Sequence, residues 1–325
     1  MAAVVEVRDL RRTYKTNTGV VRRKPLEVEA VRGISFEIAD GELFGLLGPN
    51  GAGKTTTIKM LITLLLPTSG EARVLGLDVV RQSREVRRRI GYVFGGDRGL
   101  YERLSAYDNL RYFAELYGVT GQHQRRRIGE VLELVGLAGR EQERVEGYSR
   151  GMRQRLHIAR GIIHDPEIVF LDEPTIGVDP VGARELRSTI AGLVQAGKTV
   201  LLTTHYMFEA DTLCDRLAVI ARGRLVAEGT PRELKTHVVD RNVLEVEVFG
   251  IDDATVRRIR ALAGVTSVSV EDREQTQVLT IQSPHGLELT TALTEHLDGT
   301  QIGRIATREP TLEDAYVALV TGAEE

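Results

Sequence analysis

The stretch that decides the fold is a glycine-rich segment reading, in order, Gly48, Pro49, Asn50, Gly51, Ala52, Gly53, Lys54, Thr55 and Thr56. An apolar run at residues 43–47 precedes it, and residues 58–65 follow with apolar side chains at helical spacing. A glycine loop between a strand and a helix is the context that a phosphate-binding loop requires. Its glycines let backbone amides turn toward phosphate oxygens, and the helix N-terminus adds partial positive charge. The segment predicts a nucleoside triphosphate site in which Lys54 reaches the β- and γ-phosphates and the Thr55 hydroxyl holds Mg2+.

Length and charge indicate two unequal domains. The chain has 325 residues and a net charge of −3, which gives no overall attraction to nucleic acid. Residues 241–325 contain 7 basic and 15 acidic side chains, so this part carries −8 and the remainder +5. No lysine follows Lys235. We therefore expect one domain over residues 1–238 and a second over residues 239–325.

The single cysteine and the lengths of the apolar runs indicate what kinds of disulfide or membrane segment to expect. Cys214 is the single cysteine and cannot form an internal disulfide, so we expect a buried, unreactive thiol. The N-terminus does not resemble a signal peptide, and no run reaches the 18 apolar residues typical of a membrane-spanning helix. We expect that any membrane part of this system belongs to another chain.

The order of apolar segments predicts an α/β fold. Residues 168–171 and 200–202 are continuous apolar runs, as expected for strands covered on both faces. A mostly helical pattern over 106–164 interrupts the alternation and predicts a helical subdomain inserted at about residues 97–164. Beyond residue 239 the pattern predicts β-α-β-β-α-β, with the second helix at 286–297. That order is typical of a small α+β ferredoxin-like module.

Two carboxylates follow one of the apolar strands directly. Asp172 stands where a strand-end aspartate can hold magnesium, and Glu173 points elsewhere and could polarise an attacking water. The alternative is that both merely cap a turn or a helix. Ser149 precedes an apolar helix and would suit its N-cap, and His205 follows a strand end.

Taken together, residues 4 to about 236 resemble the ATP-binding-cassette ATPases, a family of P-loop NTPases. The matches follow the family's order: Tyr14 at the adenine-stacking aromatic, Gly48–Thr56 at Walker A, Tyr148–Arg155 at the signature loop, Ile168–Glu173 at Walker B, Gly177–Pro180 at the D-loop and His205 at the switch histidine. The signature loop keeps Ser149 and Gly151 but departs elsewhere.

This resemblance implies residue roles. It gives Asp172 and Thr55 to magnesium, Glu173 to general-base catalysis, and Lys54 and His205 to catalysis at the γ-phosphate. It further implies a head-to-tail homodimer, in which Ser149, Gly151 and Asp179 of one subunit approach the ATP held by the other.

One departure lies after residues 90–94. The family has a glutamine there, whereas this chain reads Gly95-Gly96-Asp97. Our hypothesis is that Gly95 leaves room for water and that Asp97 takes over the glutamine's role. The alternative is that Asp97 caps a turn.

The most similar branch is that of the bacterial exporters that include daunorubicin-resistance ATPases. Three features carry this resemblance: the loop Gly48-Pro49-Asn50, the signature form Tyr148-Ser149-x-Gly151-Met152, and the tail Pro310–Asp314. It implies an ATPase with ATP and Mg2+ as cofactors, which powers a separate integral-membrane permease from the cytoplasmic face of the membrane. The cargo would be a drug, an antibiotic or a lipid-like molecule, and nucleic acid would not be a partner.

Two alternatives stay open. One is a soluble cassette ATPase acting on nucleic acid or ribosomes, although the chain has a single cassette and no long coiled-coil insertion. The other is an importer ATPase with a regulatory tail, whose C-terminal module would more often be a small β-barrel.

Overall fold

The computed structural model describes residues 3–18, 24–95, 99–236, 241–273, 276–284, 293, 297 and 300–322. The chain divides into two compact units, Met1–Pro231 and Arg232–Glu325. The expected boundary after residue 238 and the inserted subdomain at 97–164 stay predictions. Asp97 lies outside the described residues, as does the expected helix at 286–297 apart from Leu293 and Leu297.

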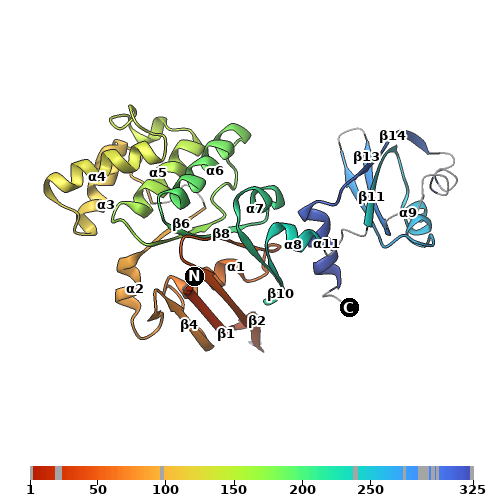
Figure 1. Cartoon of the computed structure of the whole chain (residues 1–325), viewed down its shortest axis with the longest axis horizontal. Helices are drawn as coiled ribbons and strands as arrows, with labels where there is room; N and C mark the ends of the chain where they lie inside the picture. Colours follow the sequence, from red (N-terminus) through yellow and green to blue (C-terminus); the bar gives the residue numbers. More distant parts are fainter. Residues whose placement is uncertain are drawn as a thin grey trace. The chain divides into compact units, whose positions relative to one another are not determined.

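A six-stranded mixed sheet forms the centre of the first unit (Figure 1). Its strands lie in the order β10 (Arg224–Gly229), β9 (Arg216–Ala221), β3 (Leu43–Leu47), β8 (Thr199–Thr204), β7 (Ile168–Asp172) and β6 (Ile90–Phe94). Pairing is parallel from β9 to β6, and β10 is antiparallel to β9. Every residue of β3, β7 and β8 is buried, which confirms that these apolar strands are covered on both faces.

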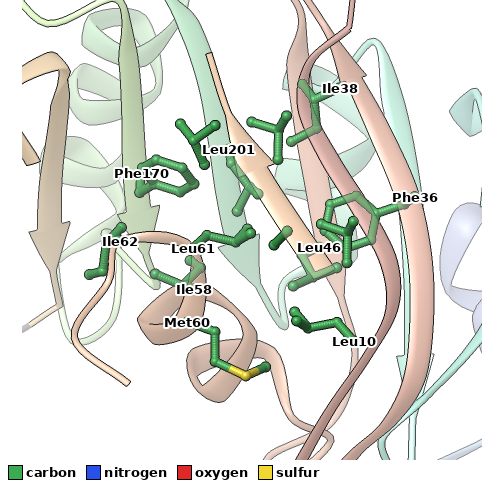
Figure 2. Packing of buried hydrophobic residues seen from close by; sticks show 14 of the residues in the cluster. Leu10, Phe36, Ile38, Leu46, Ile58, Met60, Leu61, Ile62, Phe170 and Leu201 are labelled. Carbon is green, nitrogen blue, oxygen red and sulfur yellow. The ribbon is translucent and has the colours of Figure 1, made fainter. Parts of the chain in front are cut away.

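A second, antiparallel sheet has the order β2 (Lys24–Ala39), β1 (Ala3–Thr18), β4 (Ser69–Val74) and β5 (Leu77–Asp78). Its apolar face shares a core with the large sheet and with α1 (Lys54–Leu61), the helix that follows the glycine loop. Figure 2 shows Leu61 of α1 with Phe170 and Leu201 of the large sheet in this core. Full burial of such a side chain contributes roughly 2 kcal/mol, so α1 is firmly anchored behind the loop.

The remaining helices of the first unit are α2 (Ser83–Arg89), α3 (Ala106–Leu116), α4 (Gly121–Leu134), the 3-10 turn η1 (Val145–Gly147), α5 (Arg150–Ile162), α6 (Pro180–Gln195) and α7 (Met207–Leu213). Helices α3 to α5 occupy the block predicted to be helical from its apolar spacing. Helix α5 packs on both α6 and β6, so the helical block is attached to the sheet that carries the glycine loop.

The short helix α8 (Pro231–Thr236) begins at the last residue of the first unit. The second unit contains an antiparallel sheet in the order β12 (Ser267–Asp272), β13 (Gln277–Pro284), β11 (Arg241–Phe249) and β14 (Gln301–Arg308). The first strand, β11, lies between β13 and β14, as a split β-α-β-β-α-β module requires. Helix α9 (Asp253–Arg260) and the apolar residues Leu293 and Leu297 share one core with this sheet.

The last helix, α11 (Leu312–Gly322), begins with a reciprocal capping pair formed by Thr311 and Asp314. The Thr311 amide donates to Asp314 Oδ2 at 2.7 Å, and the Asp314 amide donates to Thr311 Oγ1 at 3.4 Å. Arg308 links this cap to the sheet, because its guanidinium contacts both Asp314 and Glu245. Burial alone would raise the pKa of Asp314, but hydrogen bonds from Arg308 and Thr311 outweigh it and lower that pKa.

Composition predicted a buried, unreactive cysteine and no membrane-spanning helix. Cys214 is buried, and burial raises the pKa of its thiol far above the ordinary value, which agrees with an unreactive cysteine. Over the described part of the chain, every helix is too short or too polar to cross a bilayer.

Candidate functional site

The glycine loop runs from the end of β3 to the start of α1, and its glycines are required by close backbone contacts. Gly51 and Gly53 have φ angles of 81° and 108°, which disfavour other residues. A methyl group built on Gly53 would lie 2.5 Å from the Ala30 carbonyl oxygen, and one on Gly48 would lie 2.2 Å from that of Ile220. The loop is therefore closely packed between β2 and β9.

This loop encloses a cavity of about 150 Å³, lined by Ala30, Asn50, Gly51, Ala52, Gly53, Lys54, Thr55, Thr56 and Glu173. Lys54 is only 4% exposed, and its Nζ donates to the carbonyl oxygens of Gly48 at 2.6 Å and Pro49 at 3.2 Å. The cavity thus combines loop amides, the N-terminus of α1 and a buried ammonium group, which is the chemistry of an anion site.

Asp172 ends β7 and faces two hydroxyl groups. Its Oδ1 accepts from Thr203 Oγ1 at 2.5 Å and from Thr55 Oγ1 at 3.1 Å. β7 and β8 are parallel and in register, with Asp172 beside Thr203, so their ends meet at one edge of the sheet. A carboxylate and a hydroxyl beside an anion site are a suitable oxygen donor set for Mg2+. Thr55 and Asp172 therefore fit the metal predicted from the sequence.

Glu173 lies between Lys54 and His205. Its Oε1 is 3.4 Å from Lys54 Nζ, and its Oε2 is 3.3 Å from His205 Nδ1, without the alignment of a hydrogen bond. The backbone of Glu173 is left-handed, with φ 49°, and its amide donates to Thr203 Oγ1 at 3.0 Å. A strained backbone held by a neighbouring strand fixes the carboxylate at the cavity. The three residues predicted to be catalytic are brought together at this point.

Ser149, Gly151 and Asp179 do not occur among the described residues that line this cavity. Ser149 Oγ accepts from the Met152 amide at 3.2 Å and caps α5. Asp179 Oδ1 accepts from the Val181 and Gly182 amides at 3.1 Å and 3.0 Å and caps α6. Their predicted contact with a second subunit's nucleotide stays a prediction, and within one chain both side chains act as helix caps.

Tyr14 lies on β1 opposite Val28 of β2 and is likewise outside the described lining of the cavity. The Arg12 guanidinium lies over its ring, with 4.8 Å from Cζ to the ring centroid, and donates to the Leu66 carbonyl at 2.9 Å. Adenine stacking by Tyr14 stays a prediction. Arg12 already occupies one face of the ring, so a base could use only the other face.

The structure corrects one hypothesis, that Gly95 leaves room for water. A methyl group on Gly95 would lie 2.5 Å from the Glu173 carbonyl oxygen and 3.0 Å from Ile176 Cγ2. The Gly95 amide also donates to the Asp172 carbonyl at 2.7 Å. The space beside Gly95 is filled by the backbone that carries the two carboxylates, so a side chain at this position would require that backbone to shift.

We expect Gly95→Ala to lower ATP turnover by about 10- to 100-fold, because the added methyl group must displace the Glu173 backbone from the cavity. Phosphate release by the purified protein measures this. Gly129→Ala is the matched control, since a methyl group at Gly129 in α4 meets open space. Equal rates in both variants would contradict the close packing between Gly95 and the Glu173 backbone.

Sequence reasoning missed two residues of the site, Thr203 and Ala30. Thr203 donates to Asp172 and accepts from the Glu173 amide, so it orients both carboxylates. Its position at the end of an apolar run was a usable signal, because parallel strands end at one edge of a sheet. Ala30 contributes mainly a carbonyl from β2, and no side-chain pattern could have revealed it.

A family model described as "ABC transporter" matches residues 31–176. The daunorubicin resistance ATP-binding protein DrrA3 of Streptomyces coeruleorubidus is 40% identical over 90% of this chain and 91% of its own length. The linearmycin resistance ATP-binding protein LnrL of Bacillus subtilis is 36% identical over 89% of this chain and 93% of its own.

The chain belongs to the ABC transporter family of ATP-binding proteins. Among solved structures, a dimeric ATP-binding cassette in a post-hydrolysis state, bound to ADP and Pi, has a TM-score of 0.60 at 26% identity. The match covers 70% of this chain and 98% of the chain in that structure. The predicted family, the P-loop NTPase fold and the ATPase class are thereby confirmed. Because this ABC protein matches its resistance relatives over nearly their whole length, the similarity extends beyond the cassette into the second unit.

Proposed function

We propose that this ABC protein is the ATP-hydrolysing subunit of an exporter of drug, antibiotic or lipid-like molecules. It would power a separate integral-membrane permease from the cytoplasmic face of the membrane. The observation that carries the proposal is the match over about nine tenths of both chains to proteins named for resistance to daunorubicin and linearmycin. This similarity favours the exporter over a cassette acting on nucleic acid or ribosomes.

The site residues support a direct hydrolytic mechanism. Lys54 would exchange its bonds to the Gly48 and Pro49 carbonyls for bonds to the β- and γ-phosphates. Glu173 would accept a proton from the water whose oxygen attacks the γ-phosphorus, as ADP leaves on the opposite side. His205, beside Glu173 Oε2, would hold that carboxylate in place. Thr55 and Asp172 would hold Mg2+, which when bound would neutralise negative charge on the phosphates.

The proposed assembly is a head-to-tail homodimer. Ser149 and Gly151 lie at the N-terminus of α5, whose partial positive charge would suit the γ-phosphate held by the partner subunit. Two apolar side chains near this surface, Ile176 and Val181, are 43% and 70% exposed, as expected where another subunit packs. ATP would then join the subunits, and loss of the γ-phosphate contact would let them separate.

The proposal can be tested by isolating the protein from native-host membranes and by measuring daunorubicin export from cells. We expect the tagged full-length chain to be recovered from native-host membranes with an integral-membrane protein of about six apolar helices. Deleting its gene should raise cellular accumulation of daunorubicin, followed by fluorescence, and re-expression should restore export. Re-expression of a Glu173→Gln variant should not.

Recovery with ribosomes or nucleic acid, together with unchanged daunorubicin accumulation, would contradict the proposal. If the chain associates with a membrane protein but daunorubicin export is unchanged, repeating the assay with a fluorescent lipid analogue distinguishes the cargo classes. Unchanged export of both probes in the deletion strain would count against the export function itself.

A further inference from the structure

Two loops of the first unit are joined by an arginine. The first, called the Ser149 loop, comprises residues 148–151 at the start of α5. The second, the Gly177 loop, comprises residues 173–179 and runs from Glu173 at the cavity to the N-cap of α6. Arg150 Nη1 donates to the Gly177 carbonyl oxygen at 3.0 Å. The residue between Ser149 and Gly151 thus binds the loop that begins at Glu173.

The Gly177 backbone and the Arg150 guanidinium fit closely against each other. Gly177 has φ 67°, and a methyl group there would lie 2.5 Å from Arg150 Nη1 and 2.8 Å from its Cζ. The guanidinium therefore lies directly against glycine backbone. Next to it the helices α5 and α6 approach closely, since a methyl group on Gly151 would lie 3.1 Å from Gly182 Cα. A shift of the Gly177 backbone would therefore displace the Arg150 guanidinium.

The other end of the Ser149 loop is also fixed. Tyr148 is buried, and its hydroxyl donates to the Arg140 carbonyl at 2.7 Å. Burial raises the pKa of Tyr148 to about 12, so this donor keeps its proton at physiological pH. The loop thus extends from an anchored tyrosine to an exposed Arg150, which contacts the Gly177 carbonyl.

We propose that Arg150 is a positioning residue that couples the two nucleotide sites of the dimer. Movement of Glu173 on hydrolysis in one site would be passed through the Gly177 loop to Arg150, and so to the Ser149 loop facing the other site. The inference rests on the homodimer proposed above. It concerns a residue that is not among the described residues lining the cavity.

The coupling role of Arg150 and a purely structural role predict different effects on stability and on ATP turnover. An exposed hydrogen bond such as that from Arg150 to Gly177 contributes about 1 kcal/mol or less to stability, so we expect Arg150→Ala to change the thermal midpoint of the nucleotide-free protein only slightly. Coupling between sites depends instead on the difference between two loop states, and such coupling is typically worth about five-fold or more in affinity or rate.

The test is the dependence of phosphate release on ATP concentration for the purified full-length protein. We expect a Hill coefficient above 1 for the natural sequence and close to 1 for Arg150→Ala, with turnover at saturating ATP reduced about five-fold. Arg150→Lys should restore part of the cooperativity, because an ammonium group can still donate to the Gly177 carbonyl. Arg144→Ala is the matched control, since Arg144 is exposed and pairs only locally with Glu146 among the contacts described.

A second variant guards against indirect effects. Gly177→Ala should also lower the Hill coefficient, because its methyl group pushes the guanidinium away. In the Arg150→Ala background the same change should add little to the loss of cooperativity. Additive losses, or an Arg150→Ala curve identical to that of the natural sequence, would overturn the coupling role. A non-cooperative natural protein would overturn it as well.

These outcomes are distinct from failure of the proposed function. If the natural protein does not hydrolyse ATP, or if Glu173→Gln hydrolyses it at the normal rate, the ATPase mechanism itself is wrong. If hydrolysis depends on Glu173 but cooperativity is independent of Arg150, only the coupling inference fails.

Discussion

Lys54→Ala is expected to weaken ATP binding by at least about 100-fold and to reduce hydrolysis to background. The ammonium group is 4% exposed and lies at the cavity, where it donates to two loop carbonyls and lies 3.4 Å from Glu173 Oε1. Charge-assisted hydrogen bonds to phosphate are worth roughly 1.5–3 kcal/mol each, and alanine removes them all. Isothermal titration with Mg-ATP measures the affinity, and phosphate release measures the rate.

Lys59→Ala provides the comparison for this variant. Lys59 is on the same helix, α1, but is exposed and lies outside the described cavity lining, so its replacement should leave ATP affinity unchanged. Equal affinity in the Lys54 and Lys59 variants would show that the glycine loop does not bind the triphosphate, and the proposed role of this site would then be wrong.

Glu173→Gln is expected to lower turnover by about 10²- to 10⁴-fold while ATP binding is retained, because an amide cannot accept the proton of the attacking water. Glutamine has nearly the same shape, so the left-handed backbone at this position and its bonds to Thr203 should be preserved. The variant should therefore accumulate as an ATP-bound dimer, which size-exclusion chromatography with Mg-ATP would detect.

Glu167→Gln serves as the control for this second prediction. Glu167 immediately precedes β7, the strand that ends at Asp172, and its exposed carboxylate pairs with Arg89. Normal hydrolysis is expected for that variant. Hydrolysis at the natural rate by Glu173→Gln would assign the general base to another group, and the absence of an ATP-dependent dimer would count against the proposed assembly.

Local signals in the sequence predicted much of the cavity. The glycines at 48, 51 and 53 must allow close approach and positive φ angles, and few other residues can do so. Apolar runs without alternation predicted the buried strands β7 and β8. Such features depend on neighbours in the chain, so one sequence is sufficient to recognise them.

Contacts between distant segments could not be predicted in the same way. The hypothesis for Gly95 was wrong because it considered the missing side chain and not the Glu173 backbone, which packs against that glycine from another strand. The contact made by Arg150 could not be predicted either. In the sequence it is a departure from the signature loop, and only the fold brings its guanidinium to the Gly177 carbonyl.

The sequence by itself determined the phosphate loop and the strand-end carboxylates, because periodicity and residue type act over a few neighbouring residues. Only the tertiary structure decided which groups face one another: Thr203 beside Asp172, His205 beside Glu173, and Arg150 against Gly177. The physical reason is strand order and helix packing, which bring together atoms separated by tens of residues and leave no mark at either position alone.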